Sequence, residues 1–332
     1  MRVVRGADGP GALPRGGVVT IGNYDGLHRG QRAVLESAVA RARELGAAAV
    51  VLTFDPHPLS VLDPARAPRR LTSDRQREAL LAASGVDLLW VVRFSLALAA
   101  VPAESFVREF LVERLGAAEV RVGSAFAFGR GREGDLGLLR RLGEELGFAA
   151  LGIPERLEGA AAISSTRIRA ALEAGEAEAA ARLLGRWFAL DGTVVAGEQL
   201  GRRIGWPTAN LQRAQPGLLL PADGVYAARL RFWQEGTEAA GVANLGVRPT
   251  RGGGGERRVE IHLFDFERQI YGARVEIEFH RRLREERKFA GIEDLRAQIA
   301  RDAAAAREYF ASSPGSEKMS PPAPADGGLP TS

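Results

Sequence analysis

Apolar and polar residues follow two different patterns along the chain, and the change falls near residue 185. Before it, short apolar runs rich in β-formers alternate with amphipathic stretches of helical period, which is typical of an α/β domain with a parallel sheet. The predicted strands are 18–22, 48–54, 87–94, 119–123 and 148–153, and the predicted helices are 31–45, 74–84, 103–115 and 135–146.

From residue 186 onward, β-rich segments are separated by Gly and Pro instead of helices. This pattern predicts an antiparallel sheet or a small barrel. The predicted strands are 188–196, 224–232, 240–245, 259–266 and 273–280. A last amphipathic helix is predicted over 293–310, because its apolar residues share one stripe. That stripe consists of Leu295, Ile299, Ala303, Ala306 and Phe310.

The length of 332 residues exceeds what one compact core usually holds, so two domains are expected. We place an α/β domain at 1–185 and an all-β domain at 186–311. The remaining segment, 312–332, is rich in Pro, Ser and Gly, which predicts a disordered tail.

Composition excludes several kinds of chemistry. The absence of Cys rules out disulfides, thiolate metal sites and a cysteine nucleophile. The N-terminus lacks the apolar core of a signal peptide and no apolar run approaches the ~20 residues of a membrane span, so a cytoplasmic protein that does not enter membranes is expected. The net charge of +4 comes mostly from arginines interspersed with acids, which predicts solvated faces and no nucleic-acid partner.

A Gly-rich turn, VVTIGNYDGLHRGQ, follows the first predicted strand. The carboxyl end of such a strand is where an open parallel sheet binds ligands, and the exposed N–H groups at the following helix start favour an anion. His28 offers a ring donor to phosphate, and Gln31 shares its face of the helix. The alternative is a tight Asp-Gly turn with a surface histidine. The glycines of the turn are Gly22, Gly26 and Gly30.

A second segment, ISSTRIRAAL at 163–172, places three hydroxyls before a helix that carries Arg167 and Arg169. Hydroxyls, N–H groups at a helix start and a guanidinium suit a triphosphate. The alternative is an ordinary Ser/Thr N-cap followed by solvated arginines.

Together, IGNYDGLHRG and ISSTRIR resemble the HxGH-type nucleotidyltransferase superfamily, in the form found in bacterial FAD synthetases. TFDPHP at 53–58 and VRVGSAFAFGRGREGD at 120–135 stand in the expected order between them. The resemblance implies a Rossmann-like domain that transfers AMP from ATP to FMN and releases pyrophosphate.

By the same resemblance, His28 is the catalytic residue of this half. The implied ATP-binding residues are Gly22, Asn23, His28, Gln31, Ser164, Thr166 and Arg169. The implied flavin-binding residues are Phe54, His57, Phe126 and Phe128, although core packing explains the three phenylalanines equally well.

Two positions depart from the family pattern. Gln31 stands where the family has a second histidine, and Ala125 stands where it has an acidic or amide residue. Gln31 still donates a hydrogen bond but cannot become cationic, and Ala125 makes no polar side-chain contact. Loss of one group that stabilises transition-state charge costs on the order of 10² to 10³ in rate. An impaired or repurposed adenylyltransferase is therefore the alternative for this half.

The β-rich half contains GTVVAGEQLGRRIGWPTANL and VEIHLFDF. Thr208 and Asn210 offer oxygen ligands of the kind that Mg²⁺ prefers. Along the second segment, Glu260, His262 and Phe264 share one face of a strand, so Glu260 can point into a cavity as a general base. The alternatives are an Asn-capped turn and an exposed strand carboxylate.

GRRIGWPTANL, NLGVRPT and VEIHLFDF resemble the riboflavin kinase module in order and spacing. The resemblance implies a compact β-barrel with a C-terminal helix. It also implies that Thr208 and Asn210 bind Mg²⁺ and phosphate, while Glu260 is the catalytic base for the ribityl 5′-hydroxyl of riboflavin. The implied nucleotide-binding residues of this module are Gly197, Gly201, Arg202, Thr208 and Asn210.

The order of the two modules resembles the bifunctional prokaryotic riboflavin kinase/FAD synthetase family over about residues 17–310. This implies that riboflavin is phosphorylated to FMN with ATP, and that FMN is then adenylylated with ATP to FAD, with Mg²⁺ in both steps. One alternative is a riboflavin kinase alone, because of Gln31 and Ala125. Another is a non-catalytic flavin or nucleotide sensor whose basic surface binds nucleic acid.

Overall fold

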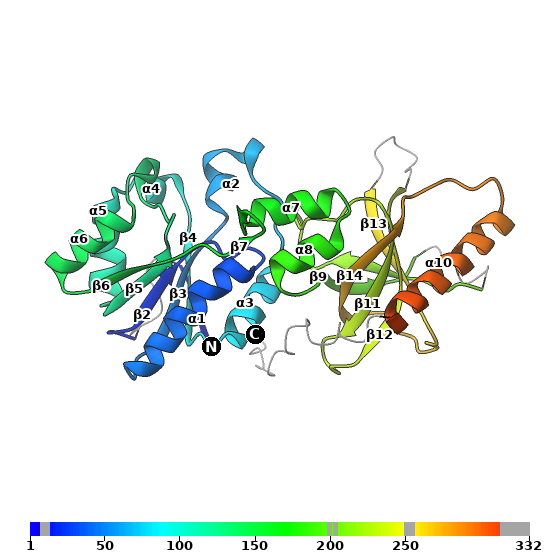
Figure 1. Ribbon diagram of the computed structural model, residues 1–332, viewed down its shortest axis with the longest axis horizontal. Coiled ribbons are helices and arrows are strands. Elements are labelled where there is room, and N and C mark those ends of the chain that lie inside the picture. The colour runs from blue at the N-terminus through cyan, green and yellow to red at the C-terminus, as the bar shows by residue number, and fades with distance from the viewer. Residues whose placement is uncertain (7–13, 198–200, 202–204, 249–255, 313–332) are drawn as a thin grey trace. The chain divides into compact units, whose positions relative to one another are not determined.

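The computed structural model describes the chain except for residues 7–13, 198–200, 202–204, 249–255 and 313–332 (Figure 1). Its described residues form two compact units. One contains residues 1–69 and 77–163, and the other contains 70–76 and the chain from Ser164 onward. The predicted tail lies outside the described residues except for Ser312, which ends a helix. The domain boundary near residue 185 stays a prediction.

The first unit contains a six-stranded parallel sheet in the order β1-β4-β3-β2-β5-β6. The chain runs outward from β2 through β3 and β4 on one side and through β5 and β6 on the other. The loop after β2 therefore lies at the switch point where such sheets bind ligands. The strands are Arg2–Arg5 (β1), Val18–Ile21 (β2), Ala49–Asp55 (β3), Leu88–Arg93 (β4), Glu119–Gly123 (β5) and Ala149–Ile153 (β6).

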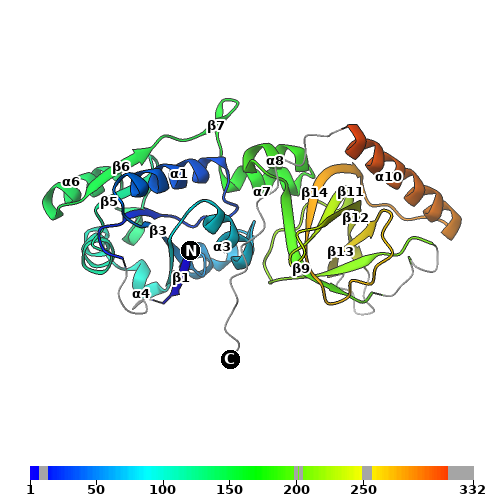
Figure 2. The same cartoon turned by 90° about the horizontal axis from the view of Figure 1, so that it is seen from below.

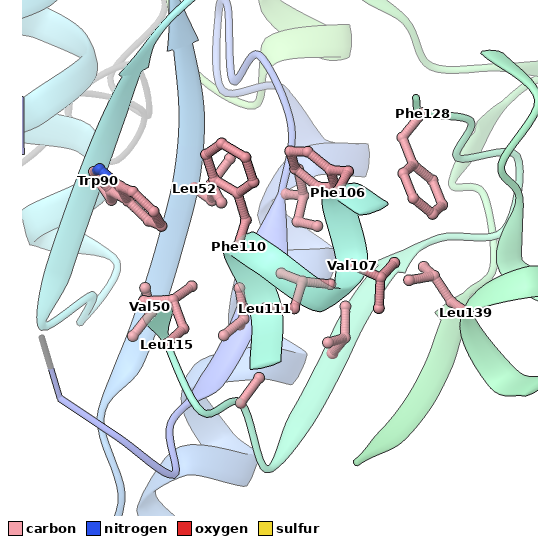
Figure 3. Packing of buried hydrophobic residues seen from close by; sticks show 14 of the residues in the cluster. Val50, Leu52, Trp90, Phe106, Val107, Phe110, Leu111, Leu115, Phe128 and Leu139 are labelled. Carbon is pink, nitrogen blue, oxygen red and sulfur yellow. The ribbon is translucent and has the colours of Figure 1, made fainter. Parts of the chain in front are cut away.

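Alternate residues of these strands enter two hydrophobic clusters. Val51 packs in one cluster with Leu35 of α1 (Arg29–Glu44) and Leu81 of α3 (Asp74–Ala83). Leu52 packs in the other cluster with Phe110, which Figure 3 shows among aromatic neighbours. That cluster is covered by α5 (Ala103–Phe106), the π-helical η2 (Val107–Arg114) and α6 (Leu136–Leu146).

The smaller elements of this unit connect the strands. They are α2 (Pro58–Leu62), the 3₁₀ turn η1 (Pro64–Arg66), α4 (Leu96–Ala99), the 3₁₀ turn η3 (Arg130–Arg132) and the hairpin of β7 (Leu157–Glu158) and β8 (Ala161–Ala162). Sequence periodicity predicted the five strands from β2 to β6 but did not predict β1.

The second unit contains a closed barrel in the order β10-β13-β12-β11-β14-β9, in which neighbouring strands pair antiparallel. The predicted small barrel is confirmed. Its strands are Phe188–Val195 (β9), Ala209–Arg213 (β10), Gly224–Phe232 (β11), Glu238–Arg248 (β12), Glu256–Leu263 (β13) and Arg274–Arg284 (β14). Two helices, α7 (Ser165–Glu173) and α8 (Ala177–Leu184), precede it.

The last helix, α10 (Ile292–Ser312), lies along the outside of the barrel (Figures 1 and 2). Ala306 and Tyr309 pack on Ala227 of β11, and Arg284 of β14 donates to Asp302 at 2.8–3.1 Å. The predicted apolar stripe is thus the face that meets the barrel. Its first turns, with Leu295 and Ile299, line a cavity instead.

A buried polar cluster joins the start of α3 to the barrel strands within the second unit. Ser73 and Gln76 form a reciprocal capping pair, and Ser73 Oγ donates to Asp191 Oδ2 at 2.8 Å. Gln76 Nε2 donates to Glu276 Oε1 at 2.6 Å. Burial raises the pKa of both carboxyl groups, because the charged form loses its hydration.

The raised pKa of Glu276 predicts a pH dependence of stability. The folded state holds this proton more tightly than the unfolded state, so the contribution of Glu276 to the free energy of unfolding is largest at low pH and is lost as the pH rises through the raised pKa. Glu276→Gln keeps an oxygen for Gln76 and removes the buried charge. It should stabilise the protein at pH 8 by about 1 kcal/mol and have little effect at pH 5.

Urea unfolding of the full chain at both pH values, followed by tryptophan fluorescence, measures this difference, since three of the four tryptophans belong to the second unit. The exposed Glu267→Gln on the same unit is the control. Equal pH dependence in Glu276→Gln and the unmodified protein would show that Glu276 does not carry the effect.

Candidate functional sites

The Gly-rich turn after β2 ends at His28, which is the N-cap of α1. Gln31 N–H donates to His28 Nδ1 at 3.3 Å, and His28 N–H donates to Gln31 Oε1 at 3.2 Å. Because Nδ1 accepts this hydrogen bond, the neutral imidazole carries its proton on Nε2. That N–H group can then donate a hydrogen bond to a phosphate. Gln31 shares the first turn with His28 as predicted, and its side chain completes the cap.

Two buried residues shape this turn. Tyr24 and Leu27 have φ values of 48° and 39°, in the left-handed region that non-glycine residues seldom occupy. The Tyr24 hydroxyl lies 2.5 Å from Thr20 Oγ1 on β2. Tight packing therefore holds the turn in a conformation that its local sequence alone does not favour. Sequence reasoning missed Tyr24, although a large aromatic residue between two glycines was a visible signal.

Asn23 and His57 lie together in the structure, although the family resemblance implies ATP binding for Asn23 and flavin binding for His57. The Asn23 side-chain amide lies 3.2 Å from His57 Nε2. His57 is the N-cap of α2, and its Nδ1 accepts from Leu59 N–H at 3.2 Å. Thr53 Oγ1 donates to the Asn23 carbonyl at 3.4 Å. The loops after β2 and β3 are thus joined at the carboxyl edge of the sheet.

The three phenylalanines of the predicted flavin set differ in environment. Phe128 is buried and packs in the main core, whereas Phe54 and Phe126 are partly buried against it. Phe126 and Phe128 stack with ring centroids 5.4 Å apart. A role in flavin binding stays a prediction, which Phe54 and Phe126 fit better because they keep exposed surface.

Ser164, Thr166 and Arg169 belong to the second unit. Ser164 is the N-cap of α7, and its hydroxyl oxygen accepts from Arg167 N–H at 3.3 Å. The Ser/Thr cap is therefore present, and the hydroxyl proton of Ser164 remains available as a donor. Their role as triphosphate ligands stays a prediction.

In the barrel, Glu260 stands between two carboxamides. On β10, Asn210 pairs with Glu260, and on β12 Asn244 pairs with the same residue. Directly paired residues of neighbouring strands lie on one face of a sheet, so the three side chains form a polar row. Thr208 Oγ1 lies 3.5 Å from Glu260 Oε2. Sequence reasoning missed Asn244, whose signal was a polar residue within the apolar run GVANLGV.

Two cavities meet at this row. The first has a volume of about 340 Å³ and contains Thr208, Asn210 and Glu260 in its wall. Its apolar lining is Trp206, Val225, Val242, Val247, Phe289, Leu295 and Ile299. The second, of about 450 Å³, is lined by Gly197, Asn210 and several polar residues including Gln212, Arg213 and Arg258. Asn210 and Arg258 belong to both, so the two cavities adjoin the same amide and the same guanidinium.

Glycines allow the backbone to approach these side chains closely. A Cβ at Gly197 would overlap the Asn210 amide, and a Cβ at Gly201 would overlap the Trp206 carbonyl. At Gly197 the backbone is thus in contact with Asn210, one of the predicted ligands. Arg202 lies outside the described residues.

The oxygen atoms of Thr208, Asn210 and Glu260 are the donors that Mg²⁺ prefers. Among the residues that the structure describes, no three His, Cys, Asp or Glu side chains are grouped so that they could hold a metal ion. The donor set therefore fits a Mg²⁺ ion that is completed by water and substrate phosphates. No helix in the described part of the chain combines the length and apolar character needed to cross a membrane.

The parallel sheet with its capped Gly-rich turn, and the barrel with its Thr-Asn-Glu cavity, define a transferase with two nucleotide-using parts. A family model for FAD synthetase matches residues 12–167, and one for riboflavin kinase matches residues 184–310. The chain belongs to the bifunctional riboflavin kinase/FMN adenylyltransferase family.

Relatives of that description match nearly the whole chain. The protein of Escherichia coli (strain K12) is 40% identical over 311 residues, which cover 93% of this chain and 98% of the relative. The Pseudomonas fluorescens protein is 40% identical over 313 residues, covering 94% and 99%. A crystal structure from Streptococcus pneumoniae, described as a macrolide-efflux protein, is 30% identical with a TM-score of 0.82 and covers 89% of this chain and 95% of that one.

The contact at Gly197 yields a test of the barrel site. Gly197→Ala should displace the Asn210 amide and lower kcat for riboflavin phosphorylation by about tenfold to a hundredfold, since small misplacements of positioning groups cost that much. Gly291→Ala is the matched control, because a Cβ there meets no atom within 4 Å. Steady-state kinetics of FMN formation measure both. An unchanged kcat in Gly197→Ala would remove Asn210 from the reacting centre.

Proposed function

We propose that this protein makes FMN from riboflavin and ATP in the barrel, and FAD from FMN and a second ATP in the first domain. Membership of the family and the match to both family models support the two activities. The observation that carries the site assignment is the row of Asn210, Glu260 and Asn244 at the wall of the apolar cavity. We also propose the domain limits 1–185 and 186–311.

For the kinase, we assign the isoalloxazine ring of riboflavin to the cavity of about 340 Å³, whose wall is largely apolar. The ribityl chain then extends to Glu260, which removes the proton of the 5′-hydroxyl. That oxygen attacks the γ-phosphorus of ATP and ADP leaves. Transfer of this kind depends chiefly on positioning and charge neutralisation.

The nucleotide phosphates fit the neighbouring cavity, where Arg213 and Arg258 supply positive charge and Gly197 leaves room for a close approach. Thr208 and Asn210 would hold Mg²⁺ together with these phosphates. When bound, the ion would neutralise charge that develops on the transferred phosphoryl group.

For the adenylyl transfer, a phosphate oxygen of FMN attacks the α-phosphorus of ATP and pyrophosphate leaves. No covalent enzyme intermediate is needed, so the residues act by orientation and by hydrogen bonds to charged oxygens. We assign Nε2–H of His28 and the amide of Asn23 to the ATP phosphates, together with the backbone at Gly22. Ser164, Thr166 and Arg169 are further ATP ligands of this proposal.

A time course tests both activities. The purified, flavin-free protein is incubated with riboflavin, ATP and Mg²⁺, and the flavins are separated by chromatography. FMN should form first and FAD should follow it, because FMN is the substrate of the second step. Absence of both products would contradict the proposed function.

The same assay examines the kinase-only alternative, which the family match does not favour. FMN as sole product, even with FMN and ATP supplied directly, would contradict the adenylyltransferase half. Gln31→His then tests the cause, because a histidine restores a group that can become cationic. A gain in FAD would assign the loss to Gln31.

Glu260→Gln should lower kcat for FMN formation by a factor on the order of 10² to 10⁴, because an amide cannot accept the hydroxyl proton. Riboflavin binding, measured by quenching of flavin fluorescence, should persist because the apolar residues that line the cavity are unchanged. FAD formation from added FMN is the internal control for folding of the first domain, and riboflavin binding is the control for folding of the barrel. Turnover near that of the unmodified protein would remove Glu260 from the role of base.

A further inference from the structure

His262 occupies a place in the barrel site that the kinase mechanism has not used. It lies on β13 two residues after Glu260, so both side chains point from the same face of the strand. Both line the cavity of about 340 Å³. A histidine at this place can act on the reaction directly or on the residues that bind substrate.

Its contacts are with the segment just before Thr208. His262 Nδ1 lies 2.8 Å from the Pro207 carbonyl oxygen. A carbonyl only accepts, so Nδ1 carries the proton and donates. The ring also meets the Trp206 ring edge-on, with centroids 4.9 Å apart at 71°. One side chain thus holds both residues that precede Thr208.

This segment is held at its other points as well. Trp206 N–H donates to the Gly201 carbonyl at 2.8 Å. At the far end, Asn210 is paired with Glu260 in the β10–β13 ladder. Pro207 lies between these ends and has no backbone N–H. Its carbonyl is therefore the backbone group through which a hydrogen bond can hold it in place.

We propose that His262 is a positioning residue for phosphoryl transfer: its Nδ1–H bond to the Pro207 carbonyl keeps the Thr208 hydroxyl beside Glu260. The proposal rests on the kinase site assigned above. His262 acts through Thr208, whose oxygen lies 3.5 Å from Glu260 Oε2. Loss of the bond should therefore lower kcat more than it weakens riboflavin binding.

His262→Leu removes the donor and keeps much of the bulk. We expect kcat for FMN formation to fall about tenfold with a smaller change in KM for riboflavin, since a positioning loss appears chiefly in the chemical step. His262→Asn can donate from nearly the place of Nδ1 and should recover activity to within about threefold of the unmodified protein. Thr237→Val, which removes an exposed hydroxyl from the same barrel, is the control.

Three results would overturn the proposal. They are a kcat for His262→Leu within about twofold of the unmodified protein, a riboflavin KM that rises in step with the fall in kcat, and an Asn variant as slow as the Leu variant. FAD formation from added FMN and thermal melting monitor folding. If the Leu variant does not fold, His262→Gln replaces it. The Gln amide lies one methylene farther from the backbone than the Asn amide, so the Gln variant should form FMN more slowly than the Asn variant. Equal rates of the Gln and Asn variants would overturn the proposal.

Glu260→Gln in the same series separates this inference from the proposed function. An active Glu260→Gln would refute the assigned kinase site. An inactive Glu260→Gln beside a fully active His262→Leu would refute the role of His262 alone.

Discussion

The pairing of Glu260 with Asn210 on one side and Asn244 on the other is the constraint on which the barrel site depends. Side chains alternate along a strand, so a slip of one residue would move Glu260 to the opposite face and separate it from both amides. The close approach of the β12 and β13 backbones favours this register. A Cβ at Gly241 would overlap the His262 carbonyl, so a glycine there lets β12 lie close against β13. Closure of the barrel through β10 then sets the position of Thr208, because the loop that carries it has to reach a strand already paired on both edges.

Most of the fold could be predicted because the apolar residues of its strands indicate which segments are buried. The runs at β5 and β11 were predicted with the bounds that the structure gives, Glu119–Gly123 and Gly224–Phe232, since the alternating valines of EVRVG and the mostly apolar run GVYAARLRF are typical of strands. The strands that were missed lack this signal. In β1 (Arg2–Arg5) only Val4 is buried, and in β10 (Ala209–Arg213) only Leu211. Both form because distant partners pair with them, and that information is not in their own residues.

The candidate sites were predictable to a similar extent and for a similar reason. Motifs placed Thr208, Asn210 and Glu260 in one site, and the structure brings them together. Contacts between remote segments were not predictable. The hydrogen bond from Gln76 to Glu276 joins residues 200 positions apart, and no local pattern indicates that a barrel carboxylate will be buried against the start of a helix. The left-handed conformation of Tyr24 is likewise a result of its packing around Thr20.

The sequence does not show which ring nitrogen of a histidine carries the proton, whereas the hydrogen bonds in the fold do. His28 is an N-cap whose Nδ1 accepts a backbone N–H, so its neutral ring presents an Nε2 donor. His262 is bound in the opposite sense, since its Nδ1 donates to a carbonyl and leaves Nε2 as an acceptor. The local backbone therefore selects a donor ring at the turn proposed for anionic phosphates. In the barrel it selects a ring whose Nδ1–H binds the Pro207 carbonyl, while Glu260 is the proposed acceptor of the substrate proton. The same residue type serves two chemistries because a cap and a strand offer its Nδ1 different partners.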